Sequence, residues 1–273
     1  MDSITKDRRT LEAQAELVHL EEELSSLIEE YDHLRLHVAD AIEASYMRKL
    51  GIYEVKVYEF ECDVARMRRK IDLFRQASNR HERVDVAEIE AELDAEWARY
   101  EEEKERRLKE CTKSLSRLNA TMMTPEETRR FKSLYRSLIK ALHPDVNPGA
   151  DAAEAALFIE ITKAYKDGDL KQLEALAVLA ESIDGKRPPA SDTFRGIEMR
   201  RIVVEQNLRM IKELIESLKS SRPFDLIRLL DDSDAVAKKQ GEFSEKLEQL
   251  KSAYRHYSAE LTNLLEGPHV EYY

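Results

Sequence analysis

The sequence predicts an all-α fold, in which long helical hairpins or coiled coils flank a small helical hairpin. Charged residues make up 36% of the 273 residues and aromatic residues only 7%, while Gly and Pro number seven each. This composition is typical of long helices rather than sheets. A hydrophobic content of 42% is enough for seams between helices and indicates a slender core.

The charge balance and the cysteines limit the classes of function. A formal net charge of −11 favours solubility and disfavours nonspecific nucleic-acid binding. Cys62 and Cys111 have no thiol or His at ligand spacing, so we interpret them as buried or half-buried reduced thiols. The first residues lack the apolar core of a signal peptide, and no run approaches the ~20 apolar residues of a membrane helix. We expect a soluble, cytoplasmic protein.

Residues 1–120 are predicted to form a region of long helices. The helical pattern resumes directly after Gly51, so we expect the helix to continue there. Asp85, with Glu88 three positions later, predicts the start of a further helix that runs to about residue 118. The short connection at residues 79–85 favours an antiparallel hairpin. The first apolar stripe comprises Leu11, Leu17, Leu20, Leu24, Leu27, Tyr31, Leu34 and Val38.

The C-terminal third divides into a linker, a second hairpin and a tail. Residues 182–195 contain Pro188-Pro189 with flanking Gly and Ser, which indicates a linker. Residues 196–266 are predicted to be a helical hairpin, with Ser233 as the cap of its last helix, and residues 267–273 a frayed tail. The expected seam of the first helix comprises Ile202, Val203, Leu208, Ile211, Leu214, Ile215 and Leu218.

Residues 121–181 hold the only stretch with much chemistry at fixed spacing. Thr124, followed by Pro125 and by Glu127 three positions later, predicts a helix start with a capping box. The helix ends at Pro144, which pushes His143 out of the helical region of backbone conformation. Its buried face is expected to contain Phe131, Leu134, Tyr135, Leu138 and Leu142. Asp151 with Glu154 predicts the next helix, which Gly168 ends.

This stretch resembles the J domain of DnaJ-type co-chaperones. The shared features are a basic helix with Leu134-Tyr135-Arg136, the tripeptide His143-Pro144-Asp145 with Asn147-Pro148 after it, and Phe158, Ile161 and Ala164-Tyr165 in the following helix. A J-like domain between coiled-coil segments is similar to a group of bacterial J-domain-like proteins.

The resemblance implies binding to a seventy-kilodalton heat-shock ATPase chaperone. In that family the basic helix docks on an acidic surface of the ATPase, and the His-Pro-Asp loop couples docking to faster ATP hydrolysis. The protein itself would catalyse nothing and would need no cofactor or metal. The implied partner-binding residues are His143, Pro144, Asp145, Arg129, Lys132, Arg136, Lys140 and Asn147.

Two departures from the family shape this expectation. The usual first helix is missing from residues 111–123, so the end of the preceding long helix, through Leu115 and Leu118, is expected to substitute for it. The Gly/Phe-rich segment and the Cys-x-x-Cys zinc module are also absent from the sequence. Specificity for a client or a scaffold partner would then come from the helical arms, which are also suited to targeting or homodimerisation.

Other interpretations of the same residues are weaker. His143-Pro144-Asp145 could be a plain turn between helices, and a catalytic dyad lacks a nucleophile beside it. His33 and His37 have the spacing of two metal ligands but no third, which favours a solvated helix face. The basic helix lacks the aromatic interleaving of a nucleic-acid site. Two functions remain: a co-chaperone, or a coiled-coil scaffold with a J-like core kept for packing.

Overall fold

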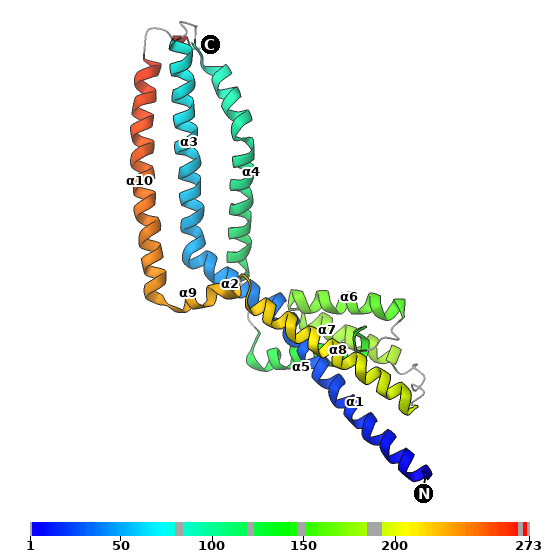
Figure 1. The fold of residues 1–273 in the computed structure, drawn as a ribbon. Helices are drawn as coiled ribbons and strands as arrows, with labels where there is room; N and C mark the ends of the chain where they lie inside the picture. The colour runs from blue at the N-terminus through cyan, green and yellow to red at the C-terminus, as the bar shows by residue number, and fades with distance from the viewer. Residues whose placement is uncertain are drawn as a thin grey trace. The chain divides into compact units, whose positions relative to one another are not determined.

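The computed structural model describes residues 2–79, 84–118, 123–146, 151–184, 193–266 and 270–271. It confirms the all-α fold (Figure 1). In chain order the helical elements are α1 Asp2–His33, the π-helical turn η1 Leu34–Val38, α2 Ala39–Tyr46, the π-helical turn η2 Met47–Gly51, α3 Ile52–Asn79, α4 Val86–Leu118, α5 Pro125–Leu142, α6 Ala152–Asp167, α7 Leu170–Asp184, α8 Phe194–Lys219, the 3₁₀ turn η3 Phe224–Leu226, α9 Ile227–Asp231 and α10 Ser233–Leu265.

The chain forms two compact units, and each is built from two separate stretches. Unit 1 comprises residues 1–40 and 121–225, and unit 2 comprises residues 41–120 and 226–273. This differs from the sequential division into 1–120, 121–181 and 196–266. The difference arises because α8 packs on α1 and α10 packs on α3, so helices that are distant in sequence share a core.

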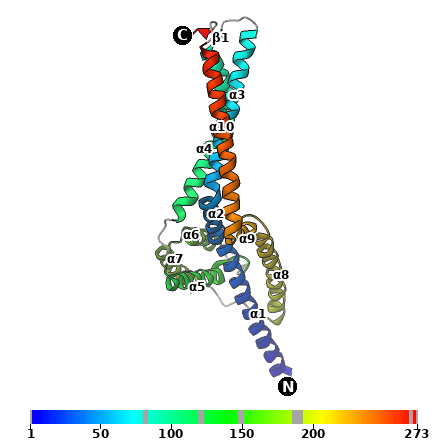
Figure 2. The ribbon, with the colours of Figure 1, turned by 90° about the vertical axis from the view of Figure 1, so that its left-hand side faces the viewer.

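Unit 2 is a row of three long helices with α3 in the middle, as Figures 1 and 2 show. Arg66 pairs with Glu90 at 2.8 Å, and Arg107 lies over the ring of Tyr58 at 4.2 Å, so α3 and α4 run antiparallel, as expected for a hairpin. Asp85 caps α4 by accepting the N–H of Ala87 at 2.8 Å. The helical path continues through Gly51, as expected, and a Cβ at that position would collide with the side chain of Met47.

The two helices of the expected C-terminal hairpin belong to different units, since α8 packs on α1 and α10 packs on α3. Helix α10 lies parallel to α3, since Glu61 pairs with Lys246 and Arg75 with Glu260. The helix is capped by Asp232, one residue before the expected Ser233, and Asp232 accepts the N–H groups of Asp234 and Ala235. The expected frayed tail is partly ordered, because strand β2 (Val270–Glu271) pairs in parallel with β1 (Val84–Asp85).

Unit 1 places α5, α6 and α7 against the pair formed by α1 and α8. Helices α1 and α8 run parallel, since Glu16 pairs with Arg201 and Glu30 with Lys219 at 3.3 and 3.1 Å. Their shared core contains Leu17, Leu24, Ile28, Val204, Leu208, Ile211 and Ile215. The sequence-based stripes were partly wrong: Leu11 is 66% exposed, and Ile202, Val203 and Leu214 lie on the outer face of α8.

The segment between α7 and α8 is shorter than the predicted linker. Helix α7 ends at Asp184, and Thr193 caps α8 by accepting the N–H of Gly196 at 3.2 Å. Residues 185–192, with the Pro188-Pro189 pair, lie outside the described residues.

Cys62 is half-buried and Cys111 is buried, both as free thiols, which confirms the expectation for the cysteines. No helix among the described residues is long and apolar enough to cross a membrane.

Candidate functional site around the His-Pro-Asp loop

The candidate site begins with the start of α5, which forms as the sequence predicts. Thr124 accepts the N–H of Glu127 at 3.2 Å, and the Glu127 carboxylate accepts the N–H of Thr124 at 2.8 Å. This capping box satisfies donors that the first helical turn leaves free. The hydrogen bonds to Thr124 also lower the pKa of the Glu127 carboxyl. Helix α5 therefore has a fixed start, which sets the register of its basic side chains.

Helix α5 ends at His143, as predicted from Pro144. His143 has φ −68° and ψ 131°, an extended conformation, while its N–H still reaches the carbonyl of Ile139 at 2.9 Å. After Pro144, the N–H of Asp145 donates to Nδ1 of His143 at 3.0 Å, and the N–H of Val146 donates to the His143 carbonyl at 3.1 Å. These two bonds close a tight turn in which Pro144 and Asp145 are exposed and Val146 is buried.

The His143 ring lies against α6 rather than free in solvent. It meets the ring of Phe158 edge-to-face, with the centroids 5.0 Å apart. Burial lowers the pKa of His143, although the charges of Asp145 and Asp32 oppose the shift. The ring is therefore neutral near pH 7, which agrees with Nδ1 acting as an acceptor and leaves the proton on Nε2. His143 is a positioned hydrogen-bonding group.

Side chains of helix α8 hold the loop by binding the loop's backbone carbonyls. The side-chain amide of Asn207 donates to the carbonyl of Asp145 at 3.1 Å, and the guanidinium of Arg200 reaches the carbonyl of Val146 at 3.5 Å. Arg200 in turn pairs with Glu21 of α1 at 2.8 Å. Arg200 and Asn207 could not be predicted from the sequence, because they lie beyond the predicted linker and belong to no recognisable motif.

Two of the four predicted docking cations are paired with α1. Arg136 lies 3.1 Å from Glu29, and Lys140 lies 2.9 Å from Glu22. Their side chains remain 48% and 43% exposed. The expected basic surface is therefore present, but acids of the same chain already neutralise part of it. The sequence does not predict these two ion pairs, because Glu22 and Glu29 have the pattern of solvated positions on an acidic helix.

The other two predicted docking cations have different surroundings. The Arg129 guanidinium lies 3.4 Å from the Pro125 carbonyl of its own helix. Lys132 is half-buried, and its charge contributes to lowering the pKa of both His33 and His37. No ion pair of Arg129 or Lys132 is seen within the described parts of the chain. Asn147, also expected to bind the partner, lies outside the described residues.

Buried carboxylates of α1 fix the inner face of α5 and α6. Tyr135 donates its hydroxyl to Asp32 at 2.7 Å, and Tyr165 donates to Glu29 at 3.1 Å. The two tyrosine rings stack with centroids 3.7 Å apart. Burial raises the pKa of both phenols, so both remain protonated donors. Helix α1 thus supplies the support that was expected from the end of α4, which belongs to unit 2.

His33 and His37 are part of this packing. The expectation that they lie on a solvated helix face was wrong. Both rings are half-buried, and His37 lies edge-to-face against Tyr165 at 5.0 Å and Phe131 at 6.1 Å. Burial lowers the pKa of His33 to about 4, with a further contribution from Lys132. The described residues contain no cluster of three or more His, Cys, Asp or Glu side chains that could hold a metal ion.

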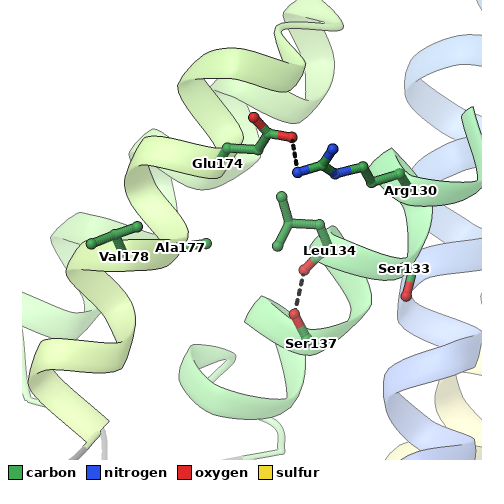
Figure 3. A pocket seen from close by; sticks show the side chains of 7 residues that line it. All are labelled: Arg130, Ser133, Leu134, Ser137, Glu174, Ala177 and Val178. Carbon is green, nitrogen blue, oxygen red and sulfur yellow. Dashed lines mark hydrogen bonds and ion pairs between the residues drawn. The ribbon is translucent and has the colours of Figure 1, made fainter. Parts of the chain in front are cut away.

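A shallow pocket of about 470 Å³ lies between α5 and α7 (Figure 3). Arg130 and Glu174 close one end of it with an ion pair of 2.8 Å. Leu134 points between the two helices toward Ala177, while Ser137 donates its hydroxyl to the Leu134 carbonyl at 2.7 Å. The ion pair leaves no cation uncommitted here, so the pocket suits an apolar side chain more than an anion. The remaining lining residues are Ser133 and Val178.

In comparisons with known proteins, no family model, curated protein or solved structure matches this chain. The resemblance to the J domain therefore depends on the motif residues alone. The structure brings three of the eight expected partner-binding residues, His143, Pro144 and Asp145, together in one exposed turn at the end of a basic helix.

Proposed function

We propose that the protein is a J-domain-like co-chaperone that docks on a seventy-kilodalton heat-shock ATPase chaperone and stimulates its ATP hydrolysis. The observation that carries the proposal is the turn at His143-Pro144-Asp145. Its side chains at Pro144 and Asp145 are exposed, while its backbone is fixed by α8. A rigid turn with exposed side chains suits recognition by a partner, because little conformational freedom is lost on binding.

The basic residues of α5 support the same role. Arg129, Arg136 and Lys140 are exposed along the helix that leads to the turn, in a chain whose net charge is −11. An acidic surface on the ATPase would be attracted to this patch and would orient the turn. Glu22 and Glu29 would then have to share or release their cations when the partner binds. Salt should weaken the complex, because exposed charges are screened.

The first test replaces the two polar side chains of the turn. We expect the wild-type protein to increase the steady-state ATPase rate of the chaperone, and His143→Gln or Asp145→Asn to remove most of that increase. Neither side chain is needed for the α8 contacts, which use backbone carbonyls. The matched control is His256→Gln, at an exposed position of α10. Equal stimulation by the wild type and both turn variants would rule out the proposal.

The second test reverses charge on α5 where the fold tolerates it. Lys140→Glu removes a pair with Glu22, whose side chain is 59% exposed, so it should lower chaperone affinity by about tenfold at low salt without unfolding unit 1. Arg136→Glu is less suitable, because it would leave the Glu29 side chain, only 6% exposed, facing a like charge. Binding is measured by calorimetric titration at two salt concentrations. Arg255→Glu on α10 is the control, and an unchanged affinity for Lys140→Glu would argue against this face.

A second candidate function follows from the pairing of α5 with α1. Arg136 and Lys140 are already bound to Glu29 and Glu22, which is what a J-like core retained only for packing would look like. In that case the protein is a helical scaffold that binds a client or a scaffold partner through its arms. Complete absence of ATPase stimulation by the wild-type protein, with intact folding, would favour this second candidate.

A further inference from the structure

Helix α8 carries an apolar stripe on the face that points away from α1. Its inner face, with Val204, Leu208, Ile211 and Ile215, is buried in the unit 1 core. On the outer side Met199 is 61% exposed and Met210 is 60% exposed. The complete outer stripe consists of Met199, Ile202, Val203, Met210 and Leu214. At helical spacing these residues fall on one face, so α8 is apolar on both sides.

The outer stripe has almost the same order of apolar and polar residues in both directions along the helix. Its centre is the polar pair Gln206-Asn207, with Val203 and Met210 equally far on either side, followed by Met199 and Leu214 equally far beyond them. Met199 and Leu214 are separated by about 22 Å at 1.5 Å per residue. A second copy of α8 in the antiparallel direction would therefore place Val203 against Met210 and Met199 against Leu214, with the polar pair against its own copy at the centre.

Charges along one edge of the stripe follow the same symmetry. Arg195 and Arg209 lie on this edge with Glu205 and Glu216, and all but the half-buried Glu205 are exposed. Within the described residues, Glu205 has only a long 4.0 Å contact with Arg201, and the other three have no ion pair. An antiparallel second copy would bring Arg195 near Glu216 and Arg209 near Glu205. In a parallel two-fold pair the charged edges of the two copies would lie on opposite sides, so these opposite charges would not meet.

From this self-complementarity we propose that the outer face of α8 is a homodimer interface, in which two copies of this chain pair antiparallel across a two-fold axis near Gln206. An interface of this kind is isologous, because the same patch is used on both copies. It does not require chaperone binding, although Asn207, at the centre of the stripe, also binds the carbonyl of Asp145 in the His-Pro-Asp loop.

The first experiment measures the mass of the full chain by sedimentation equilibrium from low to high micromolar concentration. We expect a monomer–dimer equilibrium that Val203→Asp and Met210→Lys each weaken at least tenfold, with helical content unchanged by circular dichroism. Ile159→Asp, at a 67% exposed position of α6, is the matched control and should leave the equilibrium unchanged. A monomer at all concentrations, or a dimer insensitive to both stripe variants, would overturn the proposal.

The second experiment tests the orientation. Arg195→Glu and Glu216→Arg should each weaken the dimer, and the double variant should restore it, because the two charges exchange places across the axis. In a background with Cys62→Ser and Cys111→Ser, chains with Met199→Cys are mixed with chains with Leu214→Cys under mild oxidation. Disulfide-linked heterodimers are expected. Crosslinks only between identical chains, or no recovery in the charge-swapped double variant, would exclude the antiparallel pairing.

Discussion

His143 illustrates how single residues divide between recognition and support. Its Nδ1 accepts a hydrogen bond within the loop, while its ring packs against Phe158. The neighbouring Asp145 places its carboxylate in solvent and gives only its carbonyl to Asn207. Support of the loop therefore comes from the backbone and from the His143 ring, and the side chain of Asp145 remains exposed to a partner.

Acidification should destabilise unit 1 through His33. Burial and the nearby charge of Lys132 lower the pKa of His33 to about 4 in the folded protein, from 6.5 for an ordinary His. Between these values the unfolded chain binds more protons, so the stabilisation is complete above about pH 6.5 and is lost as the pH falls toward 4. Because the ring is only half-buried, we expect a loss of about 1 to 2 kcal/mol in the free energy of unfolding.

This pH dependence is measured by urea unfolding at pH 7 and pH 4.5. Between pH 7 and pH 4.5 the wild type should lose more unfolding free energy than His33→Asn, since the substitution removes the titrating ring. His256→Asn, on exposed α10, is the control. An identical pH dependence in the wild type and His33→Asn would contradict the assignment to His33.

At the scale of elements, the sequence predicts each helix better than it predicts which helices pack together. Caps at Asp85, Thr124, Asp151 and Thr193 depend on neighbours within three residues, so their signals are local. Gly168 ends α6 with φ 70°, a conformation that glycine adopts without steric cost.

The choice of packing partners is a different problem. Helix α8 has two apolar faces, so its periodicity does not show which face is buried. Some residues of the exposed face were therefore predicted to lie in the buried seam. The candidate site shows the same division. The turn itself follows from Pro144, whereas the ion pairs of Arg136 and Lys140 with α1 bridge more than a hundred residues of sequence and carry no local signal.

At the scale of the whole molecule, each unit closes its core with helices from opposite parts of the chain. We therefore expect a core substitution in α1 to loosen segments far along the sequence. Leu24→Ala, at a fully buried position, should cost about 2 to 5 kcal/mol and lower amide protection in residues 125–142 and 194–219. Hydrogen exchange measured by mass spectrometry follows both segments at once.

The matched variant for this prediction lies in unit 2. Leu93→Ala, also fully buried, should lower protection in residues 52–79 and 233–265 and leave residues 125–142 unchanged. If Leu24→Ala affected only α1 itself, or if both variants loosened the same segments, the division into two discontinuous units would be wrong.

The contacts of Asn207 and Arg200 with backbone carbonyls have a consequence for how the loop can vary. A carbonyl oxygen is present whatever side chain occupies the position, so this anchor tolerates substitution at Asp145 and Val146 as far as hydrogen bonding is concerned. The anchor and the residues on display are thus chemically separate. Variation of the side chain at Asp145 can change what a partner recognises while these two contacts stay in place.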